Sequence, residues 1–497
     1  MAPTYALLDP VTEFLSQDHG LLIGGEEVEA ASGERFDVLN PADGTVLTTV
    51  PSAGTADVDA AVSAARDAFP AWRDMPPVQR ADLLWRLGTR IRELEDEFAE
   101  LETLDNGKPL AETHIVDIPL TSDLFRYYAG WVTKIEGQVG TPSFGNFHTY
   151  MRSEPVGVVG AIIPWNFPLL MCGYKLGPSL AAGCTVVLKP AEQTPLSALR
   201  LAEVVTEVGF PPGVVNVVTG FGESAGAPLA GHTDVDKITF TGEHTTGQKI
   251  IEASKSNLKR VSLELGGKSP SLVFDDANMD AALEGTHGAV FFNQGQCCIA
   301  GARVFVHEKV RDEFAERLAE RAGSIRLGSG LDPETTMGPL VSDEQRQRVN
   351  GYIESGRSEG ARILSGGEPP SGEGLADGYF VSPTVFVDVE PGMKIMREEI
   401  FGPVAMVGTF SDEDEAIALA NDTRFGLAAG IYTSDVGRAH RVAAKVQAGT
   451  VWVNTYGMFD AAIPYGGFKL SGFGKELGRE ALDLYLQTKT VWVNLDA

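Results

Sequence analysis

The chain has 497 residues, of which 43% are hydrophobic, an ordinary fraction for a globular protein. Because hydrophobic cores stop growing at roughly 250 to 300 residues, this length predicts two large lobes. The formal net charge of −28 argues against a nucleic-acid partner, whose phosphates would be repelled.

Four cysteines are too few for a dense disulfide framework, so we expect a reducing compartment, the cytoplasm. The N-terminal stretch MAPTYALLDP lacks the basic and apolar regions of a targeting sequence, and none is expected. The most apolar run, residues 157–174, carries Pro164, Asn166 and Pro168 at its centre. It fits a strand followed by a loop better than a membrane span, and we expect no membrane partner.

In chain order, apolar residues at helical spacing first predict helices over residues 55–69 and 77–104. From residue 156 strands alternate with helices, which is typical of a parallel α/β sheet. The expected strands are 156–164, 184–190, 213–220, 237–242 and 260–267, and the expected helices are 174–183, 194–209, 223–232 and 245–254.

A second α/β block follows residue 267. Its clearest elements are strands at 302–308, 403–410 and 449–454 and helices at 311–325 and 411–421. Two alternating segments, 146–157 and 488–495, stand outside both blocks. They predict an edge hairpin of the kind that another subunit covers.

The stretch FFNQGQCCIAGAR places Cys297 and Cys298 side by side. Neighbouring cysteines cannot reach the usual disulfide geometry without strain. A free cysteine is most often a small buried hydrophobe, but the glycine and polar residues of NQGQ are unusual for a core. They keep a reactive thiol open as the alternative to a buried hydrophobe, and a helix opening within residues 296–305 would supply the positive potential that a thiolate needs.

Two further motifs carry polar groups in apolar settings. In RVSLELGGKSP, strand alternation places Ser262 and Glu264 on one side; Glu264 is either a solvated edge residue or a general base at the end of a buried strand. In IIPWNFPLL, Asn166 either satisfies a turn carbonyl or directs its amide N–H at a developing oxyanion.

Three motifs could contact a cofactor. In VVTGFGESAG the glycines at 220, 222 and 226 miss the dinucleotide spacing by one residue. In KITFTGEHTTG a strand leads through glycine into a helix whose N-terminus could face a phosphate. In VVLKPAEQTP, Lys189 and Glu192 follow a strand end, where a carboxylate could bind ribose hydroxyls and a lysine alone is more often a surface residue.

Together these stretches resemble the aldehyde dehydrogenase superfamily. The motifs PWNFP, LKPAEQTP, LELGGKSP, FFNQGQCCIAG, EEIFGPV and PYGGFKLSGFG occur in the family's order, and the resemblance extends from Leu22 to Val493. It implies an α/β fold with a Rossmann-like NAD-binding domain (1–133 and 154–265), a second α/β catalytic domain (266–479) and a small β oligomerisation arm (134–153 and 480–497). It also implies a homotetramer or homodimer.

The resemblance assigns the nucleophile to Cys298, the general base to Glu264 and the oxyanion donor to Asn166, which the backbone N–H of Cys298 assists. It implies oxidation of an aldehyde to a carboxylic acid through a cysteine thiohemiacetal and a thioester, with hydride transfer to NAD. No metal site is implied. The alternatives are a CoA-acylating oxidation, which the presence of Glu264 disfavours, and a structural relative without activity, which the intact residues disfavour.

The resemblance also implies the cofactor contacts. Lys189 and Glu192 would hold the adenosine ribose, Glu399 the nicotinamide ribose, and Gly242 would begin the helix that meets the pyrophosphate. The full set is Ile163, Pro164, Trp165, Lys189, Glu192, Gly222, Phe240, Gly242, Glu243, Leu265, Glu399 and Phe401. Glu243 stands where many relatives have serine, and its carboxylate should turn away from the pyrophosphate. Because Glu192 would repel the extra phosphate of NADP, NAD is the expected cofactor.

The implied substrate tunnel is apolar and aromatic. Its residues are Leu120, Phe167, Leu170, Met171, Tyr174, Phe292, Cys297, Phe459 and Tyr465. Tyr174 stands where many relatives carry tryptophan, so the tunnel should be slightly wider or offer a hydroxyl. An aromatic or medium aliphatic aldehyde is the expected small-molecule substrate.

Overall fold

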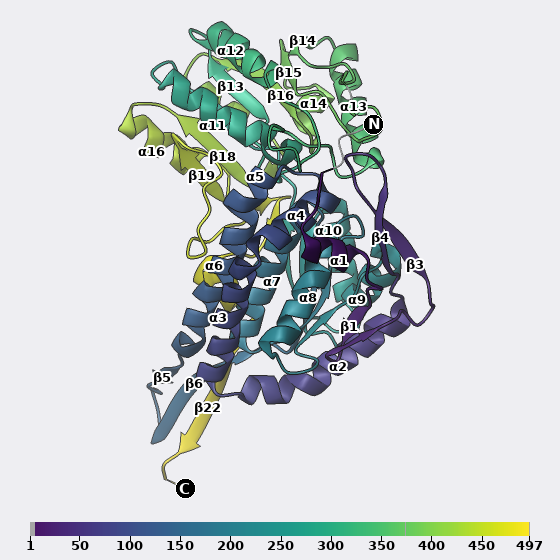
Figure 1. Ribbon diagram of the computed structural model, residues 1–497. Helices are drawn as coiled ribbons and strands as arrows, with labels where there is room; N and C mark the ends of the chain where they lie inside the picture. Colours follow the sequence, from purple (N-terminus) through teal and green to yellow (C-terminus); the bar gives the residue numbers. More distant parts are fainter. Residues whose placement is uncertain (1–4, 373, 497) are drawn as a thin grey trace.

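The computed structural model describes residues 5–372 and 374–496. Figure 1 shows two α/β lobes, with an arm of strands extending away from both of them and ending at the C-terminus. The two lobes expected from the chain length are therefore present, and each is built on its own sheet.

The first sheet forms the Rossmann-like lobe. In spatial order its strands are β2 (Glu26–Val28), β1 (Leu21–Ile23), β9 (Val215–Val217), β8 (Thr185–Lys189), β7 (Val158–Ile162), β10 (Lys237–Gly242), β11 (Arg260–Leu265) and β21 (Gly472–Phe473). The strands from β9 to β11 are parallel. Their chain order reverses between β7 and β10, which makes the sheet doubly wound and places its ligand site at the carboxyl ends of these two strands.

Helices cover both faces of this sheet because successive residues of a buried strand point to opposite sides. In β8, Val186 and Leu188 pack with α7 (Pro168–Ala182) and α8 (Leu196–Val208). Val187, which lies between them, packs with α2 (Thr55–Asp74), α9 (Ala227–Gly231) and α10 (His244–Ser254).

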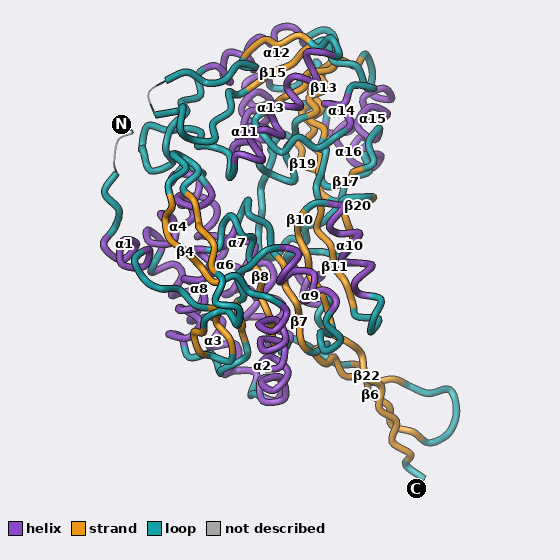
Figure 2. The backbone as a smooth tube through the Cα atoms, turned by 90° about the vertical axis from the view of Figure 1, so that its right-hand side faces the viewer, coloured by secondary structure: helices purple, strands orange, loops and turns teal. Residues whose placement is uncertain are grey.

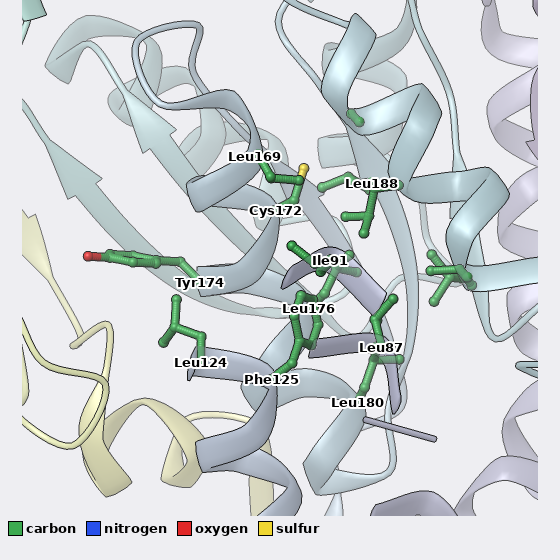
Figure 3. Packing of buried hydrophobic residues seen from close by; sticks show 14 of the residues in the cluster. Leu87, Ile91, Leu124, Phe125, Leu169, Cys172, Tyr174, Leu176, Leu180 and Leu188 are labelled. Carbon is green, nitrogen blue, oxygen red and sulfur yellow. The ribbon is translucent and has the colours of Figure 1, made fainter. Parts of the chain in front are cut away.

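A further layer of helices packs outside α7. It contains α3 (Pro77–Glu93), α4 (Glu95–Asn106) and α6 (Ile118–Trp131). Figure 3 shows Leu87 and Ile91 of α3 and Phe125 of α6 packed around Leu176 of α7, all of them fully buried. This layer supports the start of α7, which carries residues of the candidate site.

The second sheet is also mainly parallel. In spatial order its strands are β14 (Arg362–Ser365), β15 (Thr384–Val387), β16 (Val404–Phe410), β13 (Arg303–His307), β12 (Pro270–Val273), β18 (Ala428–Tyr432) and β19 (Thr450–Val453). Only β14 pairs antiparallel among them. One face packs against α11 (Met279–Phe291) and α12 (Arg311–Gly323), and the other against α13 (Asp343–Ser358), α14 (Lys394–Arg397), α15 (Glu413–Asn421) and α16 (Val436–Lys445).

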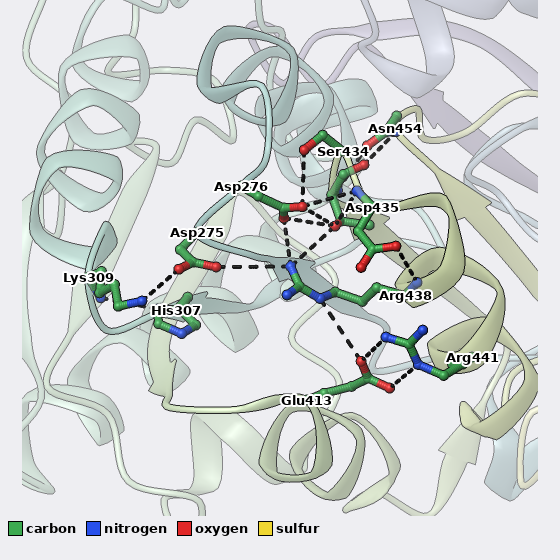
Figure 4. A network of polar contacts seen from close by, with 11 residues as sticks. Asp275, Asp276, His307, Lys309, Glu413, Ser434, Asp435, Arg438, Arg441 and Asn454 are labelled. Carbon is green, nitrogen blue, oxygen red and sulfur yellow. Dashed lines mark hydrogen bonds and ion pairs between the residues drawn. The ribbon is translucent and has the colours of Figure 1, made fainter.

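A polar network connects the ends of β12 and β18 to α16 (Figure 4). Asp276 accepts hydrogen bonds from the Thr433 hydroxyl at 2.8 Å, the Asp435 N–H at 3.0 Å and the Arg438 guanidinium at 2.7 Å. Partial burial raises the pKa of Asp276, but these donors lower it more, and the pKa lies below its ordinary value. The network fixes the carboxyl end of the second sheet.

The arm is a three-stranded sheet, which both Figure 1 and Figure 2 show projecting from the body. It consists of β5 (Gln138–Gly140), β6 (Phe147–Pro155) and β22 (Leu486–Asn494). β6 and β22 pair antiparallel from Leu486 opposite Pro155 to Asn494 opposite Phe147. The pairing expected from the alternation of the two segments is confirmed.

Three of the expected helices are present with bounds or a helix type that differ from the expectation. The helix expected over 77–104 breaks at Leu94 (φ −99°, ψ 24°) into α3 and α4, which lets each half pack its own apolar face. The helix expected over 223–232 is a π-helical turn, Gly222–Gly226, followed by α9. The helix expected over 174–183 begins at Pro168, since proline favours the first helical position.

The remaining elements are short. They are α1 (Asp9–Leu15), β3 (Arg35–Leu39), β4 (Val46–Pro51), α5 (Leu110–Glu112), β17 (Phe425–Gly426), β20 (Phe468–Lys469) and α17 (Gly478–Asp483), with a π-helical turn at Thr113–Asp117 and 3-10 turns at Val132–Lys134 and Phe292–Gly295. Within residues 5–372 and 374–496, no helix has the length and apolar composition needed to cross a membrane. The apolar run 157–174 instead forms β7, a loop and the first turns of α7.

Candidate active site

A cavity of about 220 Å³ lies at the switch point of the first sheet. The segments after β7, β10 and β11 line it, together with the Cys298 loop and residues of the second lobe. Its lining residues are Pro164, Trp165, Asn166, Phe167, Met171, Tyr174, Thr241, Gly242, Glu243, Glu264, Leu265, Gly266, Cys298, Gln345, Arg348, Glu399, Phe401 and Tyr465. The fold thus brings Asn166, Glu264 and Cys298 to one cavity from segments far apart in the chain.

Cys298 does not lie at the start of a helix, so the helix expected within residues 296–305 was wrong. It follows the 3-10 turn Phe292–Gly295 and leads through a turn into β13. Its Sγ lies 3.2 Å from the hydroxyl oxygen of Tyr465. Enclosure of the thiol raises the pKa of Cys298 to about 12, while the hydrogen bond with Tyr465 acts in the opposite direction. The thiol is therefore protonated in this state, and Tyr465 favours its ionised form.

Glu264 is the penultimate residue of β11, and its carboxyl group is buried. One oxygen accepts the Gly467 N–H at 3.1 Å, and the other has no partner among the described residues. Burial and the nearby Glu476 raise the pKa of Glu264 to about 8. Glu476 itself pairs with the buried Lys175 of α7. A carboxyl with a free oxygen and a pKa near neutrality suits a general base.

Asn166 lies in the loop between β7 and α7 and is 5% exposed. Its side-chain nitrogen donates to the main-chain oxygen of Gln296 at 2.8 Å, two residues before Cys298. An amide nitrogen carries two hydrogens, so this bond leaves one donor for the cavity. The two interpretations of Asn166 therefore coexist: it satisfies a turn carbonyl and retains an N–H that can face an oxyanion.

Glu399 and Phe401 form the opposite end of the cavity. Glu399 accepts the Gly267 N–H at 2.8 Å, and its burial raises its pKa to about 7. A Cβ atom at Gly266 would overlap the Glu399 carboxyl, so the glycine leaves room for that carboxyl in its present position. The Phe401 ring meets Trp165 edge-on, with centroids 5.2 Å apart. A carboxylate acceptor between apolar walls fits a ribose that carries a flat ring.

Four lining residues were absent from the expected contacts. Thr241 and Gly266 adjoin expected ones, whereas Gln345 and Arg348 come from a segment that sequence reasoning did not consider. Both lie on α13, three residues apart and on one face. Gln345 donates to the main-chain oxygen of Phe401 at 2.7 Å, and Arg348 donates to that of Glu399 at 3.3 Å. Helical spacing places Gln345 and Arg348 on one face of α13. No local sequence pattern indicated that this face contacts the segment of Glu399 and Phe401, about fifty residues away.

Glu243 lies directly before α10, at the helix N-terminus expected to meet a phosphate. Its carboxylate accepts a hydrogen bond from the Thr245 hydroxyl and is 46% exposed. Arg348 lines the same cavity and brings a positive charge to it. The Glu243 carboxylate is thus bonded to Thr245 in the first turn of α10, and the Arg348 guanidinium lines the same cavity.

Lys189 is the last residue of β8 and Glu192 follows three residues later, and neither lines the cavity. The Lys189 ammonium donates to the Glu192 carboxylate at 3.1 Å. Lys189 is buried, and burial lowers its pKa. The pair presents a partly exposed carboxylate next to a buried cation at the carboxyl end of β8.

Eight further expected contacts do not line the cavity. These are Leu120, Ile163, Leu170, Gly222, Phe240, Phe292, Cys297 and Phe459. Phe292 stacks on Phe167 with centroids 6.3 Å apart, and Phe459 meets Tyr465 edge-on at 5.2 Å. Cys297 is buried, and its Sγ lies 3.5 Å from the Phe292 main-chain oxygen. Aromatic side chains thus form a second layer behind the lining.

A doubly wound sheet with a cavity at its switch point defines a dinucleotide-binding protein. The model of the aldehyde dehydrogenase family matches residues 28–491. The protein DhaS of Bacillus subtilis is 53% identical over 97% of this chain and 97% of its own length. Human mitochondrial aldehyde dehydrogenase is 49% identical over 96% of this chain and 92% of its own. The structure of the NAD+ complex of aldehyde dehydrogenase from Bacillus cereus superposes with a TM-score of 0.97 at 48% identity, covering 99% of this chain and all of that one.

The chain therefore belongs to the aldehyde dehydrogenase family. It is an oxidoreductase of the class that oxidises aldehydes with a nicotinamide dinucleotide.

Proposed function

We propose that this protein oxidises an aldehyde to the carboxylic acid with NAD, through a thioester on Cys298. The observation that carries the proposal is the meeting of a thiol, a carboxyl and an amide donor in one cavity. Cys298, Glu264 and Asn166 supply a soft nucleophile, a base that is not consumed and a neutral donor.

Bond formation begins at the sulfur. The thiolate form of Cys298, whose proton has passed to water, attacks the carbonyl carbon of the aldehyde. The carbonyl oxygen becomes an alkoxide, which the free N–H of Asn166 and the backbone N–H of Cys298 stabilise. Tyr465, whose hydroxyl lies beside the sulfur, stabilises the thiolate before the attack.

The bound nicotinamide ring would supply the hydride acceptor that turns the thiohemiacetal into a thioester. Trp165, Glu399 and Phe401 would hold the ring and its ribose, and Gly266 leaves room for the Glu399 carboxylate. Lys189 and Glu192 would hold the adenosine ribose. These residues fit the cofactor because they combine acceptors for ribose hydroxyls with flat apolar surfaces.

Hydrolysis completes the reaction. The ionised Glu264 takes a proton from water, the resulting hydroxide attacks the thioester carbon, and the carbon–sulfur bond breaks. The products are the carboxylic acid and the regenerated cysteine. The unpaired oxygen of Glu264 is the acceptor for that proton.

NAD is the proposed cofactor in preference to NADP. The Glu192 carboxylate beside Lys189 suits ribose hydroxyls and would repel a 2′-phosphate. The substrate side of the cavity is formed by Phe167, Met171, Tyr174 and Tyr465, with further aromatic rings behind them. This lining supports an aromatic or medium aliphatic aldehyde.

The arm supports a homodimer or homotetramer. Val139, Phe144 and Trp492 are 73%, 67% and 53% exposed on it. Apolar side chains on a projecting sheet are a surface for another subunit. The cysteines of the chain are all free, which agrees with a reducing compartment such as the cytoplasm.

An aldehyde panel with purified protein tests the proposed function. Reduced cofactor is followed with NAD and NADP, and products are identified with and without added CoA. We expect acid formation with NAD, its loss by at least about a thousandfold in Cys298→Ser, and its retention in the matched variant Cys297→Ser. Acyl-CoA as the product, or an active Cys298→Ser enzyme, would contradict the mechanism.

A further inference from the structure

Two loops that carry proposed catalytic residues are joined by reciprocal hydrogen bonds. The Asn166 side chain donates to the main-chain oxygen of Gln296 at 2.8 Å. In return, the Asn293 side chain donates to the main-chain oxygen of Asn166 at 2.7 Å. The bonds run in opposite directions between the Asn166 loop and the Cys298 loop. They therefore restrict both translation and rotation of the Asn166 amide relative to the sulfur.

A second asparagine strengthens the connection from another side. Asn106, the last residue of α4, donates through its side-chain nitrogen to the Trp165 main-chain oxygen at 2.9 Å and more weakly to that of Asn166 at 3.4 Å. Asn106 and Asn293 are both fully buried. The peptide group of Asn166 thus lies between two buried amide donors from distant segments.

The turn that holds Asn293 has an unfavourable backbone. Asn293 and Gln294 have φ values of 47° and 57°, in the left-handed region, which asparagine adopts more readily than glutamine does. Specific bonds hold the turn: the Asn293 N–H donates to the Glu112 carboxyl at 2.9 Å, and the Gln294 side chain donates to the Gly107 main-chain oxygen at 3.1 Å. Strained backbone of this kind persists where the surroundings fix it, and it is concentrated at functional sites.

The Asn293 amide group is also incompletely satisfied. Its side-chain oxygen is buried and has no partner among the described residues. Such groups are uncommon in folded proteins, because burial of an unpaired polar atom is unfavourable. The amide nitrogen, in contrast, makes a short bond to Asn166. The contact with Asn166 is therefore the one polar bond of this side chain seen in the described structure, and a purely structural asparagine would be expected to pair both ends.

We propose that Asn293 is a positioning residue for aldehyde oxidation, which holds the Asn166 amide at the place where the alkoxide oxygen forms. The proposal rests on the proposed function, because it assigns Asn166 the role of oxyanion donor. Asn293 touches no reacting atom; it acts through the main-chain oxygen of Asn166. A displacement of about 1 Å in such a donor can lower a rate by about a hundredfold.

Two substitutions at one position separate the side-chain bond from the strained backbone. Asn293→Gly removes the amide donor and adopts positive φ readily, whereas Asn293→Ala removes the donor and keeps the strain. The readout is the single-turnover rate of reduced-cofactor formation with saturating aldehyde and NAD. We expect this rate to fall about ten- to a hundredfold in both variants. A wild-type rate in Asn293→Gly would overturn the proposal.

The thiol provides a readout that separates positioning of Asn166 from general damage. We expect the rate at which iodoacetamide alkylates Cys298 to stay within about threefold of wild type in Asn293→Gly. A parallel loss of alkylation and of turnover would show that Asn293 acts on the sulfur, and would overturn the assignment to Asn166. Asn257→Ala is the matched control, because its exposed side chain also donates to two main-chain oxygens, those of Thr233 and Val235.

A double-mutant cycle with Asn166→Ala tests the route of the effect. If Asn293 acts through the Asn166 amide, adding Asn293→Gly to Asn166→Ala should lower the single-turnover rate by less than about threefold further. Fully multiplicative losses would overturn the proposal. An Asn166→Ala enzyme with a wild-type rate would instead refute the proposed oxyanion donor, so the two failures are distinguishable. If Asn293→Gly fails to fold, Asn106→Ala removes the second donor without touching the strained turn, and the same loss is expected.

Discussion

The Sγ atom of Cys298 lies 3.2 Å from the hydroxyl oxygen of Tyr465. Tyr465 is buried, and its backbone pairs with that of Glu476. Packing within the protein therefore fixes the position of the hydroxyl group. Enclosure raises the pKa of the Cys298 thiol to about 12, and the tyrosine hydrogen bond opposes this shift. No helix N-terminus contributes, so Tyr465 is the side chain through which the protein favours the thiolate.

Replacing Tyr465 with phenylalanine should therefore make the thiol less reactive. The variant keeps the ring and loses the hydroxyl that stabilises the thiolate, so the pKa of Cys298 should rise. We expect alkylation by iodoacetamide at pH 8 to slow by roughly three- to tenfold. The measurement is the alkylation rate as a function of pH, with Phe459→Leu as a control for the neighbouring ring. Unchanged alkylation in Tyr465→Phe would contradict this role.

The pH dependence of turnover should follow Glu264. Burial raises its pKa to about 8, so the carboxylate needed for hydrolysis is the minority form at pH 7, roughly a tenth of the enzyme. Below pH 8 the rate of thioester hydrolysis should fall about tenfold per pH unit, and above pH 8 it should level off. Pre-steady-state kinetics across pH 6 to 9 would show this.

A substitution at Glu264 should make the thioester intermediate accumulate. Glu264→Gln keeps the size of the side chain and cannot accept the proton from water. We expect one equivalent of reduced cofactor per site, followed by almost no turnover, and a covalent acyl group detectable by mass spectrometry of the intact protein. Sustained turnover in Glu264→Gln would show that another group activates the water.

Cofactor preference should depend on Glu192. Glu192→Ser removes the carboxylate that would repel a 2′-phosphate and leaves Lys189 without its partner 3.1 Å away. The ratio of kcat/KM for NADP to that for NAD should rise by about ten- to a hundredfold. Steady-state kinetics with both cofactors measure the ratio. An unchanged ratio would mean that Glu192 does not approach the ribose.

The arm should control assembly. Trp492 lies within 6.2 Å of Phe144 and 5.6 Å of Phe147, measured between ring centroids, and it is 53% exposed. Trp492→Glu places a charge in this aromatic cluster, so light scattering after size exclusion should report a smaller assembly. Leu258→Glu, which changes an 88% exposed apolar residue away from the arm, is the matched control. If the assembly formed by Trp492→Glu has the same mass as the wild-type assembly, the subunit interface does not involve the arm.

The parallel strands were predictable from the sequence because their signals are local, and the candidate catalytic residues stood out through the motifs that resemble those of the family. A buried strand such as β8 is a short run of apolar residues between turns, and it remains so in any arrangement of its neighbours. Cys298, Glu264 and Asn166 each sit among glycines, prolines or polar residues that a packed core would not select. The alternation of the two arm segments likewise predicted their pairing.

Local sequence patterns gave wrong predictions where the conformation of one segment depends on contacts with another. Leu94 breaks a continuous helical pattern into α3 and α4, and the periodicity of the apolar residues does not record the break. The thiol was expected at a helix N-terminus, but bonds from elsewhere in the chain hold the preceding turn in a left-handed conformation. One of them joins Asn293 to Glu112 across 181 residues.

The sequence by itself indicated which segments are strands, since residue type and spacing decide this, and which side chains are candidates for the chemistry, since its motifs resemble those of the family. Only the tertiary structure decided which of those side chains share a cavity, how far Tyr465 lies from the sulfur and what fixes the Asn166 amide. The physical reason is that such distances depend on how two separate sheets pack against each other. That packing is a property of buried surfaces contributed by the whole chain.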